Sequence, residues 1–335
     1  MQIKNTLTEL LRIDFPMVMA PMFLASNEEM MVAAMKSGVM GVFPSLNFRN
    51  EGELEKLLNT LNQVKSGAGI KGNYGVNLIV QKTNPLYEKH LQLCVEKKVP
   101  FYITSLGNPK EVVEKAHSYG AKVFCDVTNI EHAKKAHSHG CDGFIAVGQG
   151  AGGHAGPYPL QVLVPSLHKN FPNTPVIAAG GIASGEGILS MLALGAAGVS
   201  IGTRFIASTE AKVNEAYKKA IVEANMQDIV LTTKISGTPC NIINTEYAKE
   251  IGYTQNWFEK LLSNSDITKK YFKMLVQLRG MKKLEQSVKP ANYKTLWAAG
   301  QSVELISDIK SCNEIVEELK RETFEAYRKL NEIIK

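Results

Sequence analysis

The chain lacks several features that would restrict its function at once. Its 335 residues include only five cysteines, and no two of them form a C-x-x-C pair. The first residues, MQIKNTLTELLRIDF, carry acidic side chains where a secretory signal would have its apolar segment. We therefore expect a reducing, cytoplasmic setting rather than a disulfide-stabilised secreted protein. No apolar stretch of membrane-spanning length is free of charges or clustered glycines, which predicts no transmembrane helix.

A large excess of one charge is also absent. The chain has 38 Lys and Arg against 32 Asp and Glu, a net charge of +6, and both signs alternate in EIVEELKRETFEAYRKLNEIIK. A nucleic-acid-binding surface would gather one sign on one face, so we predict no nucleic-acid partner. The small positive surplus favours an anionic small ligand. With 44% hydrophobic residues, the chain should fold as a globular protein, alone or as a small oligomer such as a homodimer.

No metal site is predicted from the histidines. His137 and His139 lie in KKAHSHGCDG near the expected end of a helix, where a cation is favourable. Only Cys141 and Asp142 follow them, and this spacing does not match a metal-ligand pattern.

Eight short apolar or β-branched runs are spaced regularly along the chain. They cover residues 16–22, 40–46, 73–80, 100–106, 121–127, 143–149, 175–182 and 197–203. Helical periodicity fills the intervals, and several of these segments begin at Ser or Asn and end at Gly. Nearly continuous apolar strands indicate a parallel sheet covered by helices. Eight of them favour an α/β fold of the closed (β/α)8 TIM barrel type over its alternative, a doubly wound open sheet.

The pattern changes after the eighth run. Residues 208–296 have mainly helical periodicity, with TTKISGTPCNII as an extended exception. We predict a helical lobe over 208–296 inserted after strand 8, and a barrel formed by 1–207 and 297–335. The C-terminal helix, from about residue 301, should return to the barrel as its last helix.

Glycines gather where the seventh and eighth predicted strands end, in AAGGIASG and SIGTRF. In TIM barrels the loops after these two strands commonly hold a phosphate. Gly180, Gly181, Gly202 and Thr203 would offer donors there, and the next helix would point its N-terminus at the same place. Arg204 could add a charge. Alternatively, the glycines only form tight turns.

The sixth strand is followed by GQGAGGHAG at the same face, which we call the mouth: the C-terminal ends of the strands. Gly152 and Gly153 let the backbone run close to a flat ligand. His154 can exchange a proton near neutral pH. A lone histidine is usually structural, but its glycine neighbours and strand-end position favour a functional role here.

Three further strand ends lead to the mouth. The first strand ends in a bend, Ala20-Pro21-Met22, whose backbone could line a ring. The third ends at Asn77, whose amide can satisfy both a donor and an acceptor on a heterocycle, and the fifth at Asp126. Each of these residues could instead cap the helix that follows.

Five motifs in this order resemble the nitronate monooxygenase (formerly 2-nitropropane dioxygenase) family of FMN-dependent TIM barrels, which includes enoyl-acyl-carrier-protein reductase II. They are APM at 20–22, GVNL at 75–78, AGGHAG at 151–156, AAGGI at 178–182 and GTRF at 202–205. AGGHxG is the most specific of them. The resemblance implies a helical, substrate-covering part after strand 8 and gives His154 the position of the catalytic histidine.

The same resemblance implies FMN across the mouth. Its phosphate would lie on Gly180, Gly181, Gly202 and Thr203, and its ring or ribityl chain near Ala20, Pro21, Met22, Asn77 and Gly152. Gly153, beside Gly152, and Asp126, where the fifth strand reaches the mouth, also belong to the predicted cofactor site. Family members often have an acidic residue where this chain has Gly150, and some have a lysine in place of Asp126. These departures leave the substrate more open than the cofactor.

Three functions compete. The first is FMN-dependent oxidation of an alkyl nitronate, such as propionate 3-nitronate, by dioxygen to a carbonyl compound and nitrite. His154 would hydrogen-bond the nitro group or remove the α-proton of a neutral nitroalkane. The second is an NAD(P)H-dependent reductase acting on an enoyl thioester or quinone; the chain has no separate G-x-G-x-x-G fingerprint, but reductases of this family do not need one. The third is a flavin-binding scaffold without turnover.

Another phosphate-binding barrel is a weaker alternative. Purine-nucleotide dehydrogenases have a catalytic cysteine loop, and no cysteine follows the sixth strand here in such a loop.

Overall fold

The computed structural model describes residues 3–81, 84–234, 237–254 and 296–334. Much of the predicted helical lobe, including NWFEKLLSN and ITKKYFKMLVQL, lies outside the described residues. Among the described helices, none has the length and apolar character needed to cross a membrane.

Eight parallel strands form a closed barrel in the order β1-β2-β3-β4-β5-β6-β8-β9, and β1 pairs with β9 to close it. The strands are β1 Met17–Met19, β2 Met40–Pro44, β3 Asn73–Ile79, β4 Phe101–Ser105, β5 Lys122–Val127, β6 Gly143–Val147, β8 Val176–Ala179 and β9 Gly198–Ile201. Each lies inside one of the eight predicted ranges. The TIM barrel is therefore confirmed, and the doubly wound alternative is wrong.

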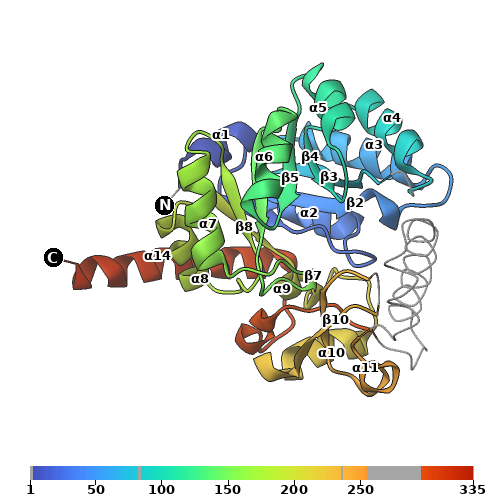
Figure 1. Ribbon diagram of the computed structural model, residues 1–335. Coiled ribbons are helices and arrows are strands. Elements are labelled where there is room, and N and C mark those ends of the chain that lie inside the picture. The colour runs from blue at the N-terminus through green and yellow to red at the C-terminus, as the bar shows by residue number, and fades with distance from the viewer. Residues whose placement is uncertain (1–2, 82–83, 235–236, 255–295, 335) are drawn as a thin grey trace.

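Helices surround the barrel (Figure 1). They are α2 Glu28–Lys36, α3 Glu53–Lys65, α4 Tyr87–Glu96, α5 Lys110–His117, α6 Ile130–Ser138, α7 Leu160–Asn170 and α8 Gly185–Ala193. The predicted start signals act as N-caps: the side chains of Asn27, Asn129 and Ser184 accept hydrogen bonds from the backbone of α2, α6 and α8.

The barrel is closed at its N-terminal end. The interior is filled by side chains such as Val42, Ile103 and Ile177, and Leu7 and Leu11 of helix α1 (Thr6–Leu11) belong to the same cluster. Asn5 also donates to the Ala197 carbonyl just before β9. Because α1 covers this end, the opposite end, the mouth, is the one open to a site.

A second, antiparallel sheet follows the barrel strands and was only partly predicted. It contains β10 Ile229–Thr232, β11 Cys240–Ile243 and, from the loop after β6, the two-residue strand β7 Gly153–His154. Strand β11 falls in the stretch expected to be extended, whereas β10 was not predicted. The described α-helices next to β10 and β11 in sequence are α9 Thr203–Ile206, α10 Glu215–Glu223 and α11 Glu246–Ile251.

The C-terminal helix begins later than predicted. Residues Gln301–Leu305 form a 3-10 helix, and α14 runs over Cys312–Ile333. Ser311 and Glu314 form a capping box that sets this start, a signal that was present in the sequence. Helix α14 packs against α8 and α2 and so occupies the remaining place in the outer ring of helices (Figure 1).

Candidate active site

The two glycine loops after β6 and β8 interlock. Gly180 has φ of +120°, and a Cβ placed on it would lie 2.6 Å from the Ala151 nitrogen. A Cβ on Gly150 would lie 3.1 Å from the Gly181 Cα. Real Cβ atoms do not come this close to a backbone nitrogen, so Gly180 cannot be replaced without moving one of the loops. Any side chain at position 150 would also crowd Gly181.

A third backbone segment presses on the loop after β6. A Cβ on Gly152 would lie 2.7 Å from the Gly300 nitrogen, and Gly300 itself donates to the Thr203 hydroxyl at 3.0 Å. Gly152 thus has a packing reason to be glycine, namely room for Ala299 and Gly300. Its contact with a flat ligand stays a prediction.

His154 stands in the second sheet rather than in the barrel. In β7 it pairs with Cys240, and Gly153, with φ of +71°, pairs with Asn241. Solvent reaches the His154 side chain, while dense protein on its other sides lowers the pKa of the imidazole below its usual value. The imidazole is therefore mainly neutral at pH 7 and able to accept a proton.

Sequence reasoning missed Asn241. This buried side chain donates through Nδ2 to the carbonyls of Gln149, at 2.9 Å, and Ala151, at 2.8 Å. It therefore joins β11 to the glycine loop directly before His154. An amide inside the apolar run of PCNII was the available signal, but its partners lie about ninety residues earlier in the chain.

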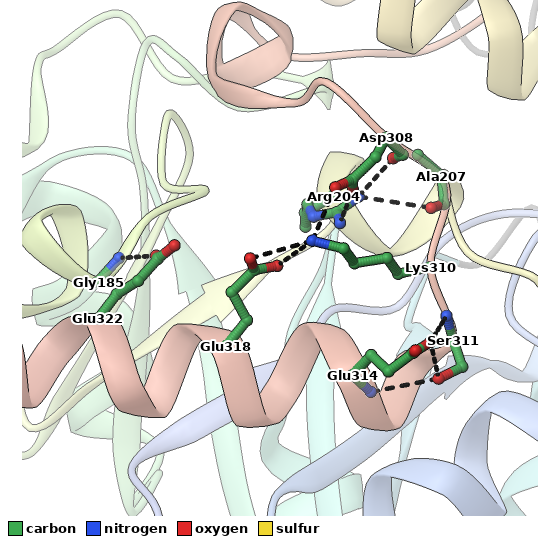
Figure 2. A network of polar contacts seen from close by, with 9 residues as sticks. All are labelled: Gly185, Arg204, Ala207, Asp308, Lys310, Ser311, Glu314, Glu318 and Glu322. Carbon is green, nitrogen blue, oxygen red and sulfur yellow. Dashed lines mark hydrogen bonds and ion pairs between the residues drawn. The ribbon is translucent and has the colours of Figure 1, made fainter.

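The predicted phosphate loops are in place, but the helix after them is partly capped by protein. The Ser184 hydroxyl accepts from the Gly187 nitrogen, and the Gly185 nitrogen donates to the Glu322 carboxylate of α14 at 2.9 Å (Figure 2). A carboxylate is thus already at the N-terminus of α8. Donors for a phosphate would have to come from the turns at Gly180 and Gly181 and at Gly202 and Thr203.

Arg204 has a different role from the one considered for it. Its buried guanidinium forms an ion pair with Asp308, with Nη2 and Oδ1 2.5 Å apart, and donates to the Asp308 carbonyl at 2.9 Å (Figure 2). Lys310 bridges Asp308 to Glu318 in the same network. Because its charge is engaged there, Arg204 anchors the segment before α14.

The ends of β1 and β9 lie side by side. A Cβ on Gly202 would be 3.6 Å from the Ala20 Cβ and 3.7 Å from the Met22 Cγ. The Ala20 nitrogen donates to the Ile201 carbonyl at 2.9 Å, which continues the β1–β9 pairing to the mouth. Pro21, between them, is half-buried. The structure thus brings the predicted bend beside one of the predicted phosphate loops.

A chain of hydrogen bonds crosses the ends of β3, β4 and β5. The Asn77 amide donates to the Ser105 hydroxyl at 2.7 Å, and this hydroxyl donates to Asp126 Oδ2 at 2.5 Å. Burial raises the pKa of Asp126 to about 6, although the bond from Ser105 works against the increase. No Lys or Arg of the described residues forms an ion pair with Asp126.

The described residues contain no cluster of three or more His, Cys, Asp or Glu arranged to hold a metal. All five cysteines are free and buried.

Comparisons with known proteins cover most of the chain. A sequence model described as nitronate monooxygenase matches residues 46–322. The chain is 27% identical over 95% of its length to (3aS,4S,5R,7aS)-5-hydroxy-7a-methyl-1-oxo-octahydro-1H-indene-4-carboxyl-CoA dehydrogenase of Mycobacterium tuberculosis, covering 96% of it. It is 26% identical over 74% of its length to a probable nitronate monooxygenase of Staphylococcus aureus, covering 80% of that protein.

Solved structures similar to this chain include enzymes from two organisms. FabK of Thermotoga maritima superposes with a TM-score of 0.84 at 30% identity, covering 99% of each chain. The nitroalkane oxidase of Streptomyces ansochromogenes superposes at 0.79 with 22% identity over 97% of this chain and all of the other, which shows the shared fold. The enzyme hypotheses are thus favoured over a scaffold without turnover, and the chain belongs to the nitronate monooxygenase family of flavin-dependent oxidoreductases.

Proposed function

We propose that this protein is an FMN-dependent enzyme that oxidises alkyl nitronates, such as propionate 3-nitronate, with dioxygen to a carbonyl compound and nitrite. The observation that carries this proposal is His154: a largely neutral imidazole, open to solvent, on a backbone segment fixed at the barrel mouth. A group of this kind can hydrogen-bond a nitro group or accept an α-proton.

The residues at the mouth fit a flavin. Gly180 and Gly181, with φ of +120° and +72°, present backbone instead of side chains at the predicted phosphate position. Asn77 is held by Ser105 and the Ile103 carbonyl and would face the polar edge of the ring system. FMN is favoured over a larger flavin because the family resemblance in the motifs is to FMN enzymes. When bound, FMN would supply the electron acceptor and the route to dioxygen.

The chain's own residues would orient the substrate and handle its proton. A nitronate already carries its negative charge on carbon and oxygen, so His154 would only need to hydrogen-bond the nitro group. A neutral nitroalkane must first lose its α-proton, and the neutral His154 imidazole could accept it. The interlocked glycine loops would keep that imidazole in place during the transfer.

The test starts with the absorbance spectrum of the purified protein. Flavin bands, with FMN identified after release by mass, would establish the cofactor. Anaerobic addition of propionate 3-nitronate should bleach these bands, and readmission of air should release nitrite. A protein that takes up no flavin, or a flavin that the nitronate does not reduce, would contradict the proposal.

A second candidate, an NAD(P)H-dependent reductase of an enoyl thioester, is supported by two observations. FabK and the CoA dehydrogenase are similar to this chain over nearly its full length. Asp126 also places a carboxylate at the mouth without a described cationic partner, which suits a neutral substrate better than an anion. Bleaching by NADH or NADPH, but not by the nitronate, would favour this candidate.

A further inference from the structure

We propose that Asn241 is a positioning residue that fixes His154 at the mouth by clamping the glycine loop in front of it. The inference rests on the proposed function for the role of His154, but not on the identity of the substrate. Asn241 belongs to β11, so the second sheet, and not the barrel, would determine where His154 lies.

The contacts of Asn241 are specific. Both of its described side-chain hydrogen bonds use Nδ2 and end on carbonyls of the glycine loop, Gln149 and Ala151. Asn241 is 7% exposed and Ala151 is 9% exposed, so water offers the Ala151 carbonyl little compensation if the amide is removed. A buried carbonyl left without its donor costs free energy, and the loop would move to find another partner.

The loop needs such a clamp because of its composition. Gly148, Gly150, Gly152 and Gly153 stand within six residues and restrict the backbone less than any other residue type. Ordering each residue costs backbone entropy, which specific contacts must offset. Asn241 binds the carbonyls of Gln149 and Ala151, and so it also restricts Gly150 between them.

Because β7 is short, few contacts fix the register of its pairing with β11. Only two residue pairs, Gly153 with Asn241 and His154 with Cys240, define the pairing, and one backbone bond from Ala155 to the Pro239 carbonyl follows. Successive side chains of a strand point to opposite faces, so a slip of one residue would turn His154 away from its present side. The two side-chain hydrogen bonds of Asn241 stabilise this same register.

The main test compares Asn241→Leu with the wild type in the flavin-loaded enzyme. Leucine has as many side-chain heavy atoms as asparagine, carries no charge and lacks the donors. We expect kcat to fall on the order of 10- to 100-fold, with flavin affinity changed much less. Asn170→Leu is the matched control, because the Asn170 amide also donates to a backbone carbonyl, Ser166, but on the exposed end of α7. It should leave kcat unchanged.

A second readout does not depend on turnover. In protein labelled at histidine nitrogens, the His154 signal is the one that disappears in His154→Gln, and its titration can be followed by NMR. Asn241→Leu should shift the His154 pKa upward toward the ordinary histidine value, because a loosened loop exposes the imidazole to more water. Asn241→Ser, which keeps one short donor, should shift it less and serves if the leucine variant does not fold.

The outcomes separate the two proposals. A wild type that binds no flavin and oxidises nothing would end the proposed function, while the His154 titration would still test the clamp. Variants at Asn241 with the wild-type His154 titration and the wild-type pH profile of kcat/KM would overturn the inference, whatever their stability.

Discussion

The two halves of the barrel mouth are built in different ways. On the side of β6, β8 and β9, three backbone segments touch one another where their glycines lack side chains, at Gly150 and Gly180 and at Gly152 and Gly300. On the side of β3, β4 and β5, three side chains, Asn77, Ser105 and Asp126, form a hydrogen-bonded chain. We call these the glycine half and the side-chain half.

This difference between the two halves indicates which substitutions the fold can tolerate. In the glycine half the backbone itself is the packing surface, so an added methyl group displaces a loop. In the side-chain half the backbone is ordinary strand, and a side chain can be exchanged while the barrel stays intact. The first half should therefore respond to substitution with lost structure, and the second with altered charge and pH dependence.

The largest effect is expected for Gly180→Ala. A left-handed backbone at a non-glycine residue costs roughly 1–3 kcal/mol, and the contact with the Ala151 nitrogen adds the cost of moving a loop. We expect the free energy of unfolding to fall on the order of 3 kcal/mol and flavin binding to weaken, measured by urea unfolding and flavin titration.

Gly120→Ala is the control for this variant. Gly120 also has a positive φ, +84°, but a Cβ there meets nothing within 4 Å. It should lose only about 1–2 kcal/mol, the cost of the left-handed conformation, and should bind flavin normally. Equal losses in the two variants would mean that the glycine half is not tightly interlocked.

The next largest effect is expected for His154→Gln, the titratable side chain carried by the glycine half. Loss of a general base or hydrogen-bonding group typically reduces turnover by about 10²- to 10⁴-fold. Because His154 is accessible to solvent, stability and flavin affinity should hardly change. His168→Gln, on the exposed end of α7, is the control and should retain full turnover. Turnover retained in His154→Gln would remove His154 from the mechanism.

The barrel strands could be predicted from the sequence, whereas the contacts of the glycine half could not. All eight barrel strands were predictable, because apolar runs, cap residues and terminal glycines are local signals repeated in each βα unit. The strand β7, its partner β11 and the clamp by Asn241 join segments about ninety residues apart, and local patterns carry no information on such pairing. The glycines were recognised, but the packing of Gly152 and Gly180 against protein backbone was not.

The charges were the hardest to interpret. Arg204 stands in a motif beside predicted phosphate donors, yet its partner is Asp308, more than a hundred residues later. Glu322 caps α8 although it belongs to α14. In both cases the partner comes from a distant part of the chain, which local sequence patterns do not indicate.

In the side-chain half, Asp126→Asn should change the pH dependence of stability. Burial raises the pKa of Asp126 to about 6, so between its ordinary value of 3.8 and 6 the folded state holds a proton that the unfolded state releases. Its contribution is therefore lost as pH rises through this window. The variant should gain stability over the wild type at pH 8 and gain less at pH 4, as measured by urea unfolding. The same gain at both values would show that Asp126 titrates normally.

The smallest effect is expected for Ser105→Ala, which removes the middle of the chain but neither end. The bond from Ser105 holds the pKa of Asp126 down, so its loss should raise that pKa further and move the pH-dependent loss of stability to higher pH. Asn77 keeps its bond to the Ile103 carbonyl, so we expect a change in the free energy of unfolding of only about 1 kcal/mol. Flavin affinity should stay close to the wild-type value. If Ser105→Ala instead weakened flavin binding as strongly as Gly180→Ala, the side-chain half would be as much a structural part of the mouth as the glycine half, and the distinction between them would fail.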